Sequence, residues 1–259
     1  MTVYTEVRGQ GPDLVLLHGW GLSGAAWSVV VKQLEQSFRL TLVDLPGHGR
    51  SPWDDTKAYT IEKVAAQVRA VTPKNAAWLG WSMGGLIAMH IALQQQAHQP
   101  QPVKQLLLLA CNAQFVRTEQ WLHAMDGNVL SQFASGLEQD YKTTLNRFLS
   151  IQAMGGEHAK QTVRELKKNM EHHGVPSLVA LRGGLALLRE LSFVEVLADL
   201  HIPTLLMFGH LDTLVPARVA EDMQSRMPQA DVHIFEHASH APFISHVDEF
   251  VSVVKAFIK

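Results

Sequence analysis

Residues 76–93 read AAWLGWSMGGLIAMHIAL, a short apolar run that leads through Gly80-Trp-Ser82-Met-Gly84 into a longer apolar run. The first run is typical of a buried strand and the second of a helix. A G-x-S-x-G sequence between a strand and a helix predicts a sharp elbow, because side chains at the glycine positions would collide with neighbouring backbone. Such a turn exposes the serine hydroxyl at the carboxyl edge of a sheet. We therefore identify Ser82 as a candidate nucleophile.

On both sides of this elbow, short apolar runs alternate with longer amphipathic ones, which is typical of βαβ units and a mainly parallel sheet. Several short runs are continuously apolar, which suits strands covered by helices on both faces. We expect strands at Thr2–Val7, Leu14–Leu17, Leu40–Val43, Ala77–Leu79, Lys104–Leu109, Thr204–Phe208 and Val232–Phe235. We expect helices in this part of the chain at Ala25–Gln36, Ile61–Val71, Met83–Gln95, Ala217–Arg226 and Val247–Ile258.

The alternation stops between residues 112 and 191, where no strand pattern is visible. Helix-like periods there cover Glu119–Phe133, Tyr141–Gln152, His158–His172 and Pro176–Leu188. Because the sheet pattern resumes at Ile202–Phe208, this stretch is better interpreted as an inserted cap than as a second independent domain. The predicted organisation is a core domain of residues 1–111 and 192–259 with an all-helical cap at 112–191.

Composition excludes several classes of protein. The 259 residues are 47% hydrophobic and 18% charged, unlike a disordered chain, and the formal net charge of -2 gives no general attraction to nucleic acid. No apolar run approaches the roughly 20 residues of a membrane span, and the N-terminal segment has no apolar signal region. Cys111 is the only cysteine, so no internal disulfide or thiolate metal cluster can form. We expect a cytoplasmic monomer with no nucleic-acid or membrane partner.

A serine hydroxyl needs an adjacent base to act as a nucleophile, and the base in turn needs an acid to orient it. Asp212 and His240 each follow an expected strand, at the edge where active sites of open parallel sheets form. His237 competes with His240 as the base, and His240 is preferred because it lies deeper in the loop and begins a His-Ala-Pro turn. Asp44 also follows a strand, but it precedes Ser82, so we expect a structural role for it.

Leu17-His18-Gly19-Trp20-Gly21 follows the first long apolar strand. An H-G-x-G loop at this place can supply one backbone N–H to an oxyanion hole, the other coming from the residue after the nucleophile. Trp20 and Met83 are therefore the expected pair, and they would stabilise the negative oxygen of a tetrahedral intermediate. A glycine-rich turn without a catalytic role is the alternative. No metal-binding or dinucleotide-binding pattern is visible, so no cofactor is expected.

These features together predict a serine hydrolase of the α/β-hydrolase fold, with a mostly parallel central sheet flanked by helices and an inserted all-helical cap. The sequence further resembles the pimeloyl-acyl carrier protein methyl ester carboxylesterase family of biotin synthesis. The resemblance runs nearly end to end and rests on the segments VLLHGWGL, LVDLPGHGRS, WLGWSMGGL, RFLSIQAMG, ELKKNM, GGLALL, LDTLVP and HAPFISH. It implies hydrolysis of a methyl ester on a pimeloyl chain carried by acyl carrier protein, without metal or organic cofactor.

The resemblance also implies site residues. The triad of the family falls on Ser82, Asp212 and His240. Its substrate contacts fall on Trp20, Ser82, Met83 and His240 and on the cap run Phe148, Leu149, Ser150, Ile151 and Gln152. An apolar slot under the cap would hold the methylene chain and place the ester at Ser82. For Phe148, Leu149 and Ile151 the alternative is ordinary helix core.

The cap carries a local charge signal. Between Tyr141 and Lys168 it has six Lys or Arg side chains but only two Glu, which leaves the rest of the chain acidic. A basic cap suits an acidic carrier protein, because complementary charge steers association. The basic cap positions of the resembled family correspond to Arg147, Lys160 and Arg164, whereas Thr143 stands where relatives can have arginine. A merely solvated helix face is the alternative.

Two other functions share these motifs. A broad short-chain carboxylesterase or a carbon–carbon bond hydrolase uses the same triad and the same kind of cap. A ligand receptor of this fold, with vestigial catalysis, is a third hypothesis, although every residue type of the triad and the oxyanion loop is present.

Overall fold

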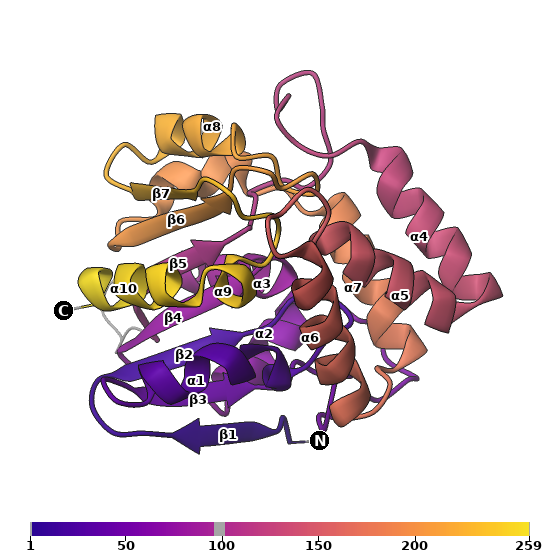
Figure 1. The fold of residues 1–259 in the computed structure, drawn as a ribbon, viewed down its shortest axis with the longest axis horizontal. Coiled ribbons are helices and arrows are strands. Elements are labelled where there is room, and N and C mark those ends of the chain that lie inside the picture. The colour runs from indigo at the N-terminus through magenta and orange to yellow at the C-terminus, as the bar shows by residue number, and fades with distance from the viewer. Residues whose placement is uncertain (1, 96–101, 259) are drawn as a thin grey trace.

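A computed structural model describes residues 2–95 and 102–258. In these residues seven strands form one sheet in the order β1-β3-β2-β4-β5-β6-β7 (Figure 1). Only β1 is antiparallel to its neighbour, and all the other pairs are parallel. Each expected strand is present, with the largest shift at the first. The strands are β1 Thr5–Arg8, β2 Asp13–Leu17, β3 Arg39–Val43, β4 Ala76–Trp81, β5 Val103–Leu109, β6 Thr204–Gly209 and β7 Asp231–Phe235.

The continuous apolar runs form strands because both faces of the sheet are covered. Leu14 and Leu16 of β2 belong to one hydrophobic cluster, whereas Val15 and Leu17 belong to the other. One cluster includes η1 (Gly24–Trp27), α1 (Ser28–Leu34), α9 (Pro242–Ser245) and α10 (Val247–Phe257). The other includes α2 (Ile61–Arg69), α3 (Met83–Leu93), η2 (Val194–Asp199) and α8 (Val219–Arg226), and it extends into the cap.

The described residues between β5 and β6 contain four α-helices and only isolated bridges in place of strands. They are α4 Gly127–Gln139, α5 Tyr141–Gln152, α6 Ala159–His172 and α7 Leu178–Glu190, which Figure 1 shows grouped beside one end of the sheet. A bridge between Gln114 and Ser192 joins the two ends of this segment. The Ser177 N–H donates to the Gly47 carbonyl at 2.8 Å, which ties the start of α7 to the core.

The expectation of a helix over Glu119–Phe133 was wrong in its bounds, because the helix there spans Gly127–Gln139. Helix α4 begins at Gly127, because the carboxylate of Asp126 caps it by accepting from the Asn128 N–H. Before that cap the chain makes a tight antiparallel bridge between Thr118 and Trp121. The indole N–H of Trp121 donates to the buried side chain of Asn112, so this segment follows a tertiary contact rather than its apolar period.

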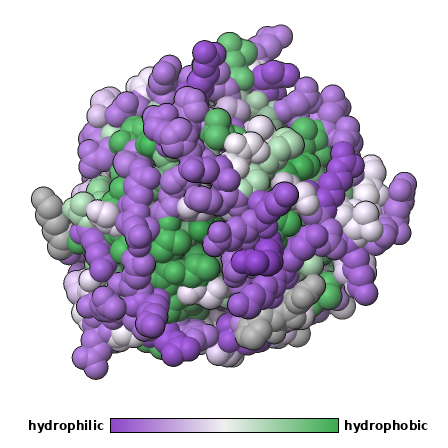
Figure 2. Space-filling model, viewed as in Figure 1, coloured by the Kyte–Doolittle hydropathy of each residue, from purple (hydrophilic) through white to green (hydrophobic). Residues whose placement is uncertain are grey.

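Hydrophobic residues on the visible face of the molecule lie among hydrophilic ones (Figure 2). Figure 2 shows that the face seen in Figure 1 is mainly hydrophilic, with small and separate hydrophobic areas. Among the described residues, no helix combines the length and the apolar character that crossing a bilayer requires.

Candidate active site

Ser82 lies between β4 and α3 with φ of 55° and ψ of -118°, a backbone conformation that non-glycine residues rarely adopt. The flanking glycines are required by close packing. A Cβ on Gly80 would lie 2.5 Å from the Gly84 carbonyl oxygen, and one on Gly84 would lie 2.5 Å from the Leu17 carbonyl oxygen. The elbow expected from the G-x-S-x-G sequence is therefore present. It places Ser82 at the carboxyl edge of the parallel strands.

Asp212 and His240 meet at the same edge, after β6 and β7. The Nδ1–H of His240 donates to Oδ2 of Asp212 at 2.7 Å, and both side chains are buried. The other carboxylate oxygen, Oδ1, accepts the N–H groups of Leu214 and Val215 at 2.8 and 3.0 Å. The Asp212 carboxylate is thus fixed by three donors and can hold one tautomer and one orientation of the imidazole. His237, the competing histidine, is exposed.

The backbone of His240 makes two more long-range hydrogen bonds. The indole Nε1–H of Trp81 donates to the His240 carbonyl at 2.9 Å, and the two rings lie 5.8 Å apart. The His240 N–H donates to the carbonyl of Gln152, the last residue of α5, at 3.0 Å. Because Trp81 directly precedes Ser82, the histidine loop is attached both to the elbow and to the cap. Sequence reasoning missed both contacts.

The loop expected to form the oxyanion hole lies beside the elbow, since a Cβ on Gly19 would be 3.5 Å from the Cβ of Ser82. Met83 begins α3, and the N–H of a first helical residue has no intrahelical acceptor. The N–H of Trp20 shares a peptide plane with the Gly19 carbonyl, which accepts from His18 Nδ1 at 2.8 Å. This contact fixes the plane and hence the direction in which the Trp20 N–H points.

His18 is buried beside His48, with ring centroids 5.5 Å apart. Burial lowers the pKa of His18 to about 4, although the Gly19 hydrogen bond and nearby Asp44 act in the opposite direction. Its Nε2 accepts the Leu45 N–H at 2.9 Å, so the neutral ring carries its proton on Nδ1. Burial and the neighbouring His18 lower the pKa of His48 to about 3. Both rings are therefore neutral structural groups near pH 7.

Asp44 is fully buried and joins the segments that contain Gly24 and Arg50. Its carboxylate accepts the Gly24 N–H at 2.7 Å and both the main-chain N–H and the Nε–H of Arg50 at 2.9 and 2.7 Å. Burial alone would raise the pKa of Asp44, but the hydrogen bonds from Arg50 and Gly24 hold it below its ordinary value. This geometry supports the structural role expected for Asp44.

The cap places an aromatic group directly over the predicted oxyanion loop. Phe148 of α5 meets the Trp20 indole edge to face, with centroids 4.8 Å apart. The indole Nε1–H donates to the Leu181 carbonyl of α7 at 2.8 Å, so Trp20 is held between two cap helices. A Cβ on Gly184 would lie 2.6 Å from Trp20 and 2.9 Å from the Met83 sulfur. These residues form an apolar layer between the cap and the elbow.

The remaining predicted substrate contacts of α5 are not all in this layer. Leu149 packs in the other hydrophobic cluster, with Leu166 of α6. Ser150 is exposed and its hydroxyl donates to the Asn146 carbonyl, on nearly the opposite side of the helix from Phe148. Ile151 is half-buried, and Gln152 is buried with its side-chain Oε1 lacking a partner in the described part of the chain.

The predicted docking side chains Arg147, Lys160 and Arg164 are all exposed. On α6, Lys160, Arg164 and Lys168 recur every fourth residue and therefore share one face of the helix. Within residues 2–95 and 102–258, no ion pair involves these side chains or Arg147. Thr143 lies in the first turn of α5, where its hydroxyl donates at 2.6 Å to the carboxylate of Asp140, the residue that caps this helix.

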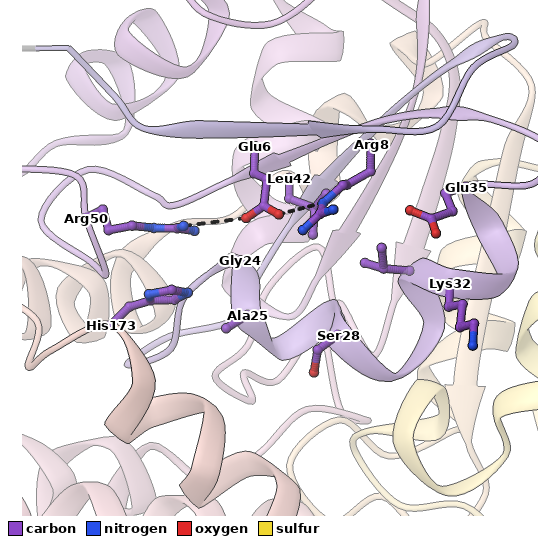
Figure 3. Close-up of a pocket in the computed structure, with 11 residues that line it drawn as sticks. Glu6, Arg8, Gly24, Ala25, Ser28, Lys32, Glu35, Leu42, Arg50 and His173 are labelled. Atoms are coloured by element: carbon purple, nitrogen blue, oxygen red, sulfur yellow. Dashed lines mark hydrogen bonds and ion pairs between the residues drawn. The ribbon is translucent and has the colours of Figure 1, made fainter.

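A charged cleft of about 610 Å³ lies elsewhere, between β1, α1 and the end of α6 (Figure 3). Its guanidinium groups are already paired, Arg8 with Glu6 at 2.7 Å and Arg50 with Asp44 at 2.7 Å. None of the predicted catalytic residues lines this cleft. In the described part of the chain, no three His, Cys, Asp or Glu side chains are grouped as metal ligands.

The chain is similar to known proteins both in sequence and in fold. Residues 12–247 match the sequence profile of the alpha/beta hydrolase fold family. The pimeloyl-acyl carrier protein methyl ester esterase of Aeromonas salmonicida is 41% identical over 258 residues, which cover 100% of both chains. The enzyme of that name from Vibrio atlanticus is 40% identical over 99% of this chain and 98% of its own length. An esterase structure from Exiguobacterium antarcticum is 24% identical, with a TM-score of 0.87 over 98% of this chain and 94% of its own, and shows the same fold.

Proposed function

Because the chain belongs to the family of pimeloyl-acyl carrier protein methyl ester esterases, we propose that it hydrolyses the methyl ester of a pimeloyl group carried on acyl carrier protein. The chain is an esterase of the α/β-hydrolase fold, and its substrate places it in biotin synthesis. The observation that carries the proposed chemistry is the buried Asp212–His240 hydrogen bond of 2.7 Å at the sheet edge that bears the Ser82 elbow.

In the first half of the reaction, Ser82 Oγ attacks the ester carbonyl carbon while His240 Nε2 accepts the hydroxyl proton. Asp212 holds the proton on Nδ1, so that Nε2 is the free base, and it stabilises the imidazolium that forms. The N–H groups of Trp20 and Met83 donate to the negative oxygen of the tetrahedral intermediate. The bond to the methoxy group then breaks, and methanol leaves with the proton from His240.

In the second half, water attacks the acyl-enzyme carbonyl and gives a proton to His240. The second tetrahedral intermediate collapses, His240 returns the proton to Ser82 Oγ, and the carboxylic acid departs and ionises in solvent. The pimeloyl group remains attached to its carrier at the other end. All of the reacting protons are carried by side chains of this protein and by water, so the proposed reaction needs no cofactor.

The layer of Trp20 and Phe148 suits the methylene chain of the substrate, because it presents apolar rings next to Ser82. Gln152 is also buried: its main-chain carbonyl accepts the His240 N–H, and its side-chain Oε1 has no partner in the described residues. We assign substrate contact to Trp20, Met83, Phe148 and Gln152 among the predicted residues. Leu149 and Ser150 lie away from this layer, and we assign them to helix packing and solvent.

The carrier protein would dock on the exposed basic side chains of α5 and α6. Arg147, Lys160 and Arg164 project from neighbouring cap helices and are free of intramolecular ion pairs in the described residues, so their charge is available to an acidic partner. Steering of this kind raises the rate of association and weakens as salt is added. Because the proposed partner is the carrier protein of a biosynthetic pathway, we propose that this protein is also cytoplasmic.

Turnover of the carrier-linked methyl ester, followed by mass spectrometry of the intact carrier, tests the proposal. The wild-type protein should convert the ester completely to the acid, and Ser82→Ala should leave it intact. The matched control is the free methyl ester of a short acid at the same concentration, which should react far more slowly. Survival of the carrier-linked ester alongside rapid cleavage of the short ester would instead establish a broad short-chain esterase.

A further inference from the structure

Trp81 makes a contact that the elbow motif does not require. Its indole is fully buried, and its Nε1–H donates to the main-chain carbonyl of His240 at 2.9 Å. Most buried indole N–H groups in proteins find an acceptor, and for Trp81 the acceptor belongs to the predicted base, 159 residues further along the chain. The side chain before the nucleophile therefore bonds to the backbone of the residue that must deprotonate it.

The His240 loop is held by isolated hydrogen bonds to other elements, among them those from the Leu211 N–H to the Ala238 carbonyl at 2.9 Å and from the Glu157 N–H to the His237 carbonyl at 3.1 Å. Residues 236–241 join β7 to α9 without regular secondary structure, so no strand or helix ladder fixes them. The His240 N–H is bonded to the Gln152 carbonyl of the cap and the ring Nδ1 to Asp212. The hydrogen bond from the Trp81 indole connects the His240 backbone directly to β4, the strand that leads into Ser82.

The Trp81 ring itself is held rigidly. It contacts Phe243 of α9 edge to face at 4.8 Å between centroids and lies 6.4 Å from Trp27. At the other end of this short connection, the Ser82 N–H donates to the Leu109 carbonyl at 2.9 Å, which fixes the elbow to β5. A rigid indole between two fixed points can set the separation between the Ser82 and His240 backbones.

We propose that Trp81 is a positioning residue that aligns His240 with Ser82 through the main-chain carbonyl of His240. The inference rests on the proposed function, because it assigns Trp81 to the step in which His240 takes the serine proton. Proton transfer needs heavy atoms within hydrogen-bond reach, and a misplacement of about 1 Å can cost about 100-fold in rate. Loss of the indole donor should thus lower kcat while substrate binding is preserved.

The chain offers a matched control in Trp27. It is also fully buried and also contacts Phe243, at 4.6 Å, but its Nε1 has no hydrogen-bond partner in the described residues. Trp27→Phe and Trp81→Phe remove the same atoms from the same aromatic cluster. Only Trp81→Phe also removes a hydrogen bond, so the difference between the two variants isolates the contact with His240.

The experiment measures kcat and KM for a chromogenic short-chain ester, together with the labelling rate of Ser82 by a fluorophosphonate. Trp81→Phe should lower kcat and the labelling rate by the same factor, about 10- to 100-fold, with KM changed by less than about twofold. Trp27→Phe should keep kcat within about threefold of wild type. Equal kcat values for the two variants, or a rise in KM alone, would overturn the proposal.

Two further arms keep the test decisive. If Trp81→Phe does not fold, benzothienylalanine at position 81 keeps the bicyclic shape but lacks the N–H, and it should show the same loss of kcat. Wild-type kcat with that analogue would overturn the proposal. His240→Ala tests the proposed function separately: an active His240→Ala refutes the mechanism, whereas an inactive one beside equal tryptophan variants refutes only the role of Trp81.

Discussion

The main-chain carbonyl of Gln152 accepts a hydrogen bond from the main-chain N–H of His240 at 3.0 Å. Five residues later, the Glu157 N–H donates to the His237 carbonyl at 3.1 Å. The end of α5 and the segment that follows it are therefore hydrogen-bonded to the histidine loop at two points. The cap that we propose as the docking surface is thus also part of the support of the proposed base, so a displaced cap would misalign His240.

Asp212→Asn should lower kcat by about 10³- to 10⁴-fold with a small change in KM, because an amide can no longer hold the imidazole in the required tautomer. Steady-state kinetics with a chromogenic ester measure this. Asp222→Asn is the matched control, since Asp222 of α8 makes a similar contact of 2.9 Å with His123, and neither residue belongs to the proposed triad. Comparable kcat in the two variants would show that the Asp212 contact serves stability alone.

Reversal of charge on α6 should affect the carrier-linked substrate only. Lys160→Glu combined with Arg164→Glu is expected to raise KM for the carrier-linked ester about 10-fold at low salt and to leave kinetics on a free short-chain ester unchanged. Lys74→Glu, an exposed charge at the opposite edge of the sheet, should change neither. The docking proposal fails if the double reversal and the control give the same KM for the carrier-linked ester.

Gly209→Ala should destabilise the protein and its active-site loops together. A Cβ at this position would lie 2.0 Å from the Ser239 carbonyl oxygen and 2.6 Å from that of Ala238, in the loop that carries His240. Backbone must shift to relieve such an overlap, at a cost of about 2–4 kcal/mol in the free energy of unfolding. Gly127→Ala, whose Cβ would meet only a side-chain methyl of Val116 at 3.2 Å, is the control. Urea unfolding should separate the two variants clearly.

Acid should destabilise the fold through His18 and His48. Burial lowers their pKa values to about 4 and about 3, from an ordinary value of 6.5. Between pH 6.5 and pH 4 these two histidines bind protons in the unfolded chain but not in the folded protein. The free energy of unfolding therefore falls as the pH drops from 6.5 towards 4. Each histidine contributes about 1.4 kcal/mol per pH unit to that slope.

His48→Asn keeps a donor for the Pro46 carbonyl and removes one titrating ring. The variant should therefore show about half of the acid dependence that these two rings cause, measured as the free energy of unfolding between pH 6 and pH 4. The surface substitution His201→Asn should retain the wild-type slope. A His48→Asn slope equal to that of wild type would mean that His48 takes up protons equally in the folded and unfolded states, which would contradict the prediction.

The strands and the elbow were predictable because local sequence patterns determine them. The continuous apolar run before Gly80 formed β4, and the amphipathic period over Tyr141–Gln152 formed α5 with the expected bounds. The order of Ser82, Asp212 and His240 after the parallel strands β4, β6 and β7 was also readable, since parallel strands bring their carboxyl ends to one edge.

What the sequence could not reveal depends on contacts between distant residues. Helix α4 begins at Gly127 because of the Asp126 cap and the Asn112–Trp121 hydrogen bond, and not where the apolar period of residues 119–133 begins. The bonds from Trp81 and Gln152 to the His240 backbone join separate elements and leave no spacing signal. A tryptophan directly before the elbow serine is visible in the sequence, but nothing in the sequence identifies the acceptor of its indole N–H.

The most direct test of the account is to map the residue that a fluorophosphonate labels and to measure its labelling rate in wild type and in His240→Gln. We predict one label per chain, on the peptide that contains Ser82, formed at least about 100-fold more slowly in the variant because the hydroxyl has lost its base. A label on another residue, or equal rates in the two proteins, would contradict the claim that Asp212, His240 and the elbow together activate Ser82.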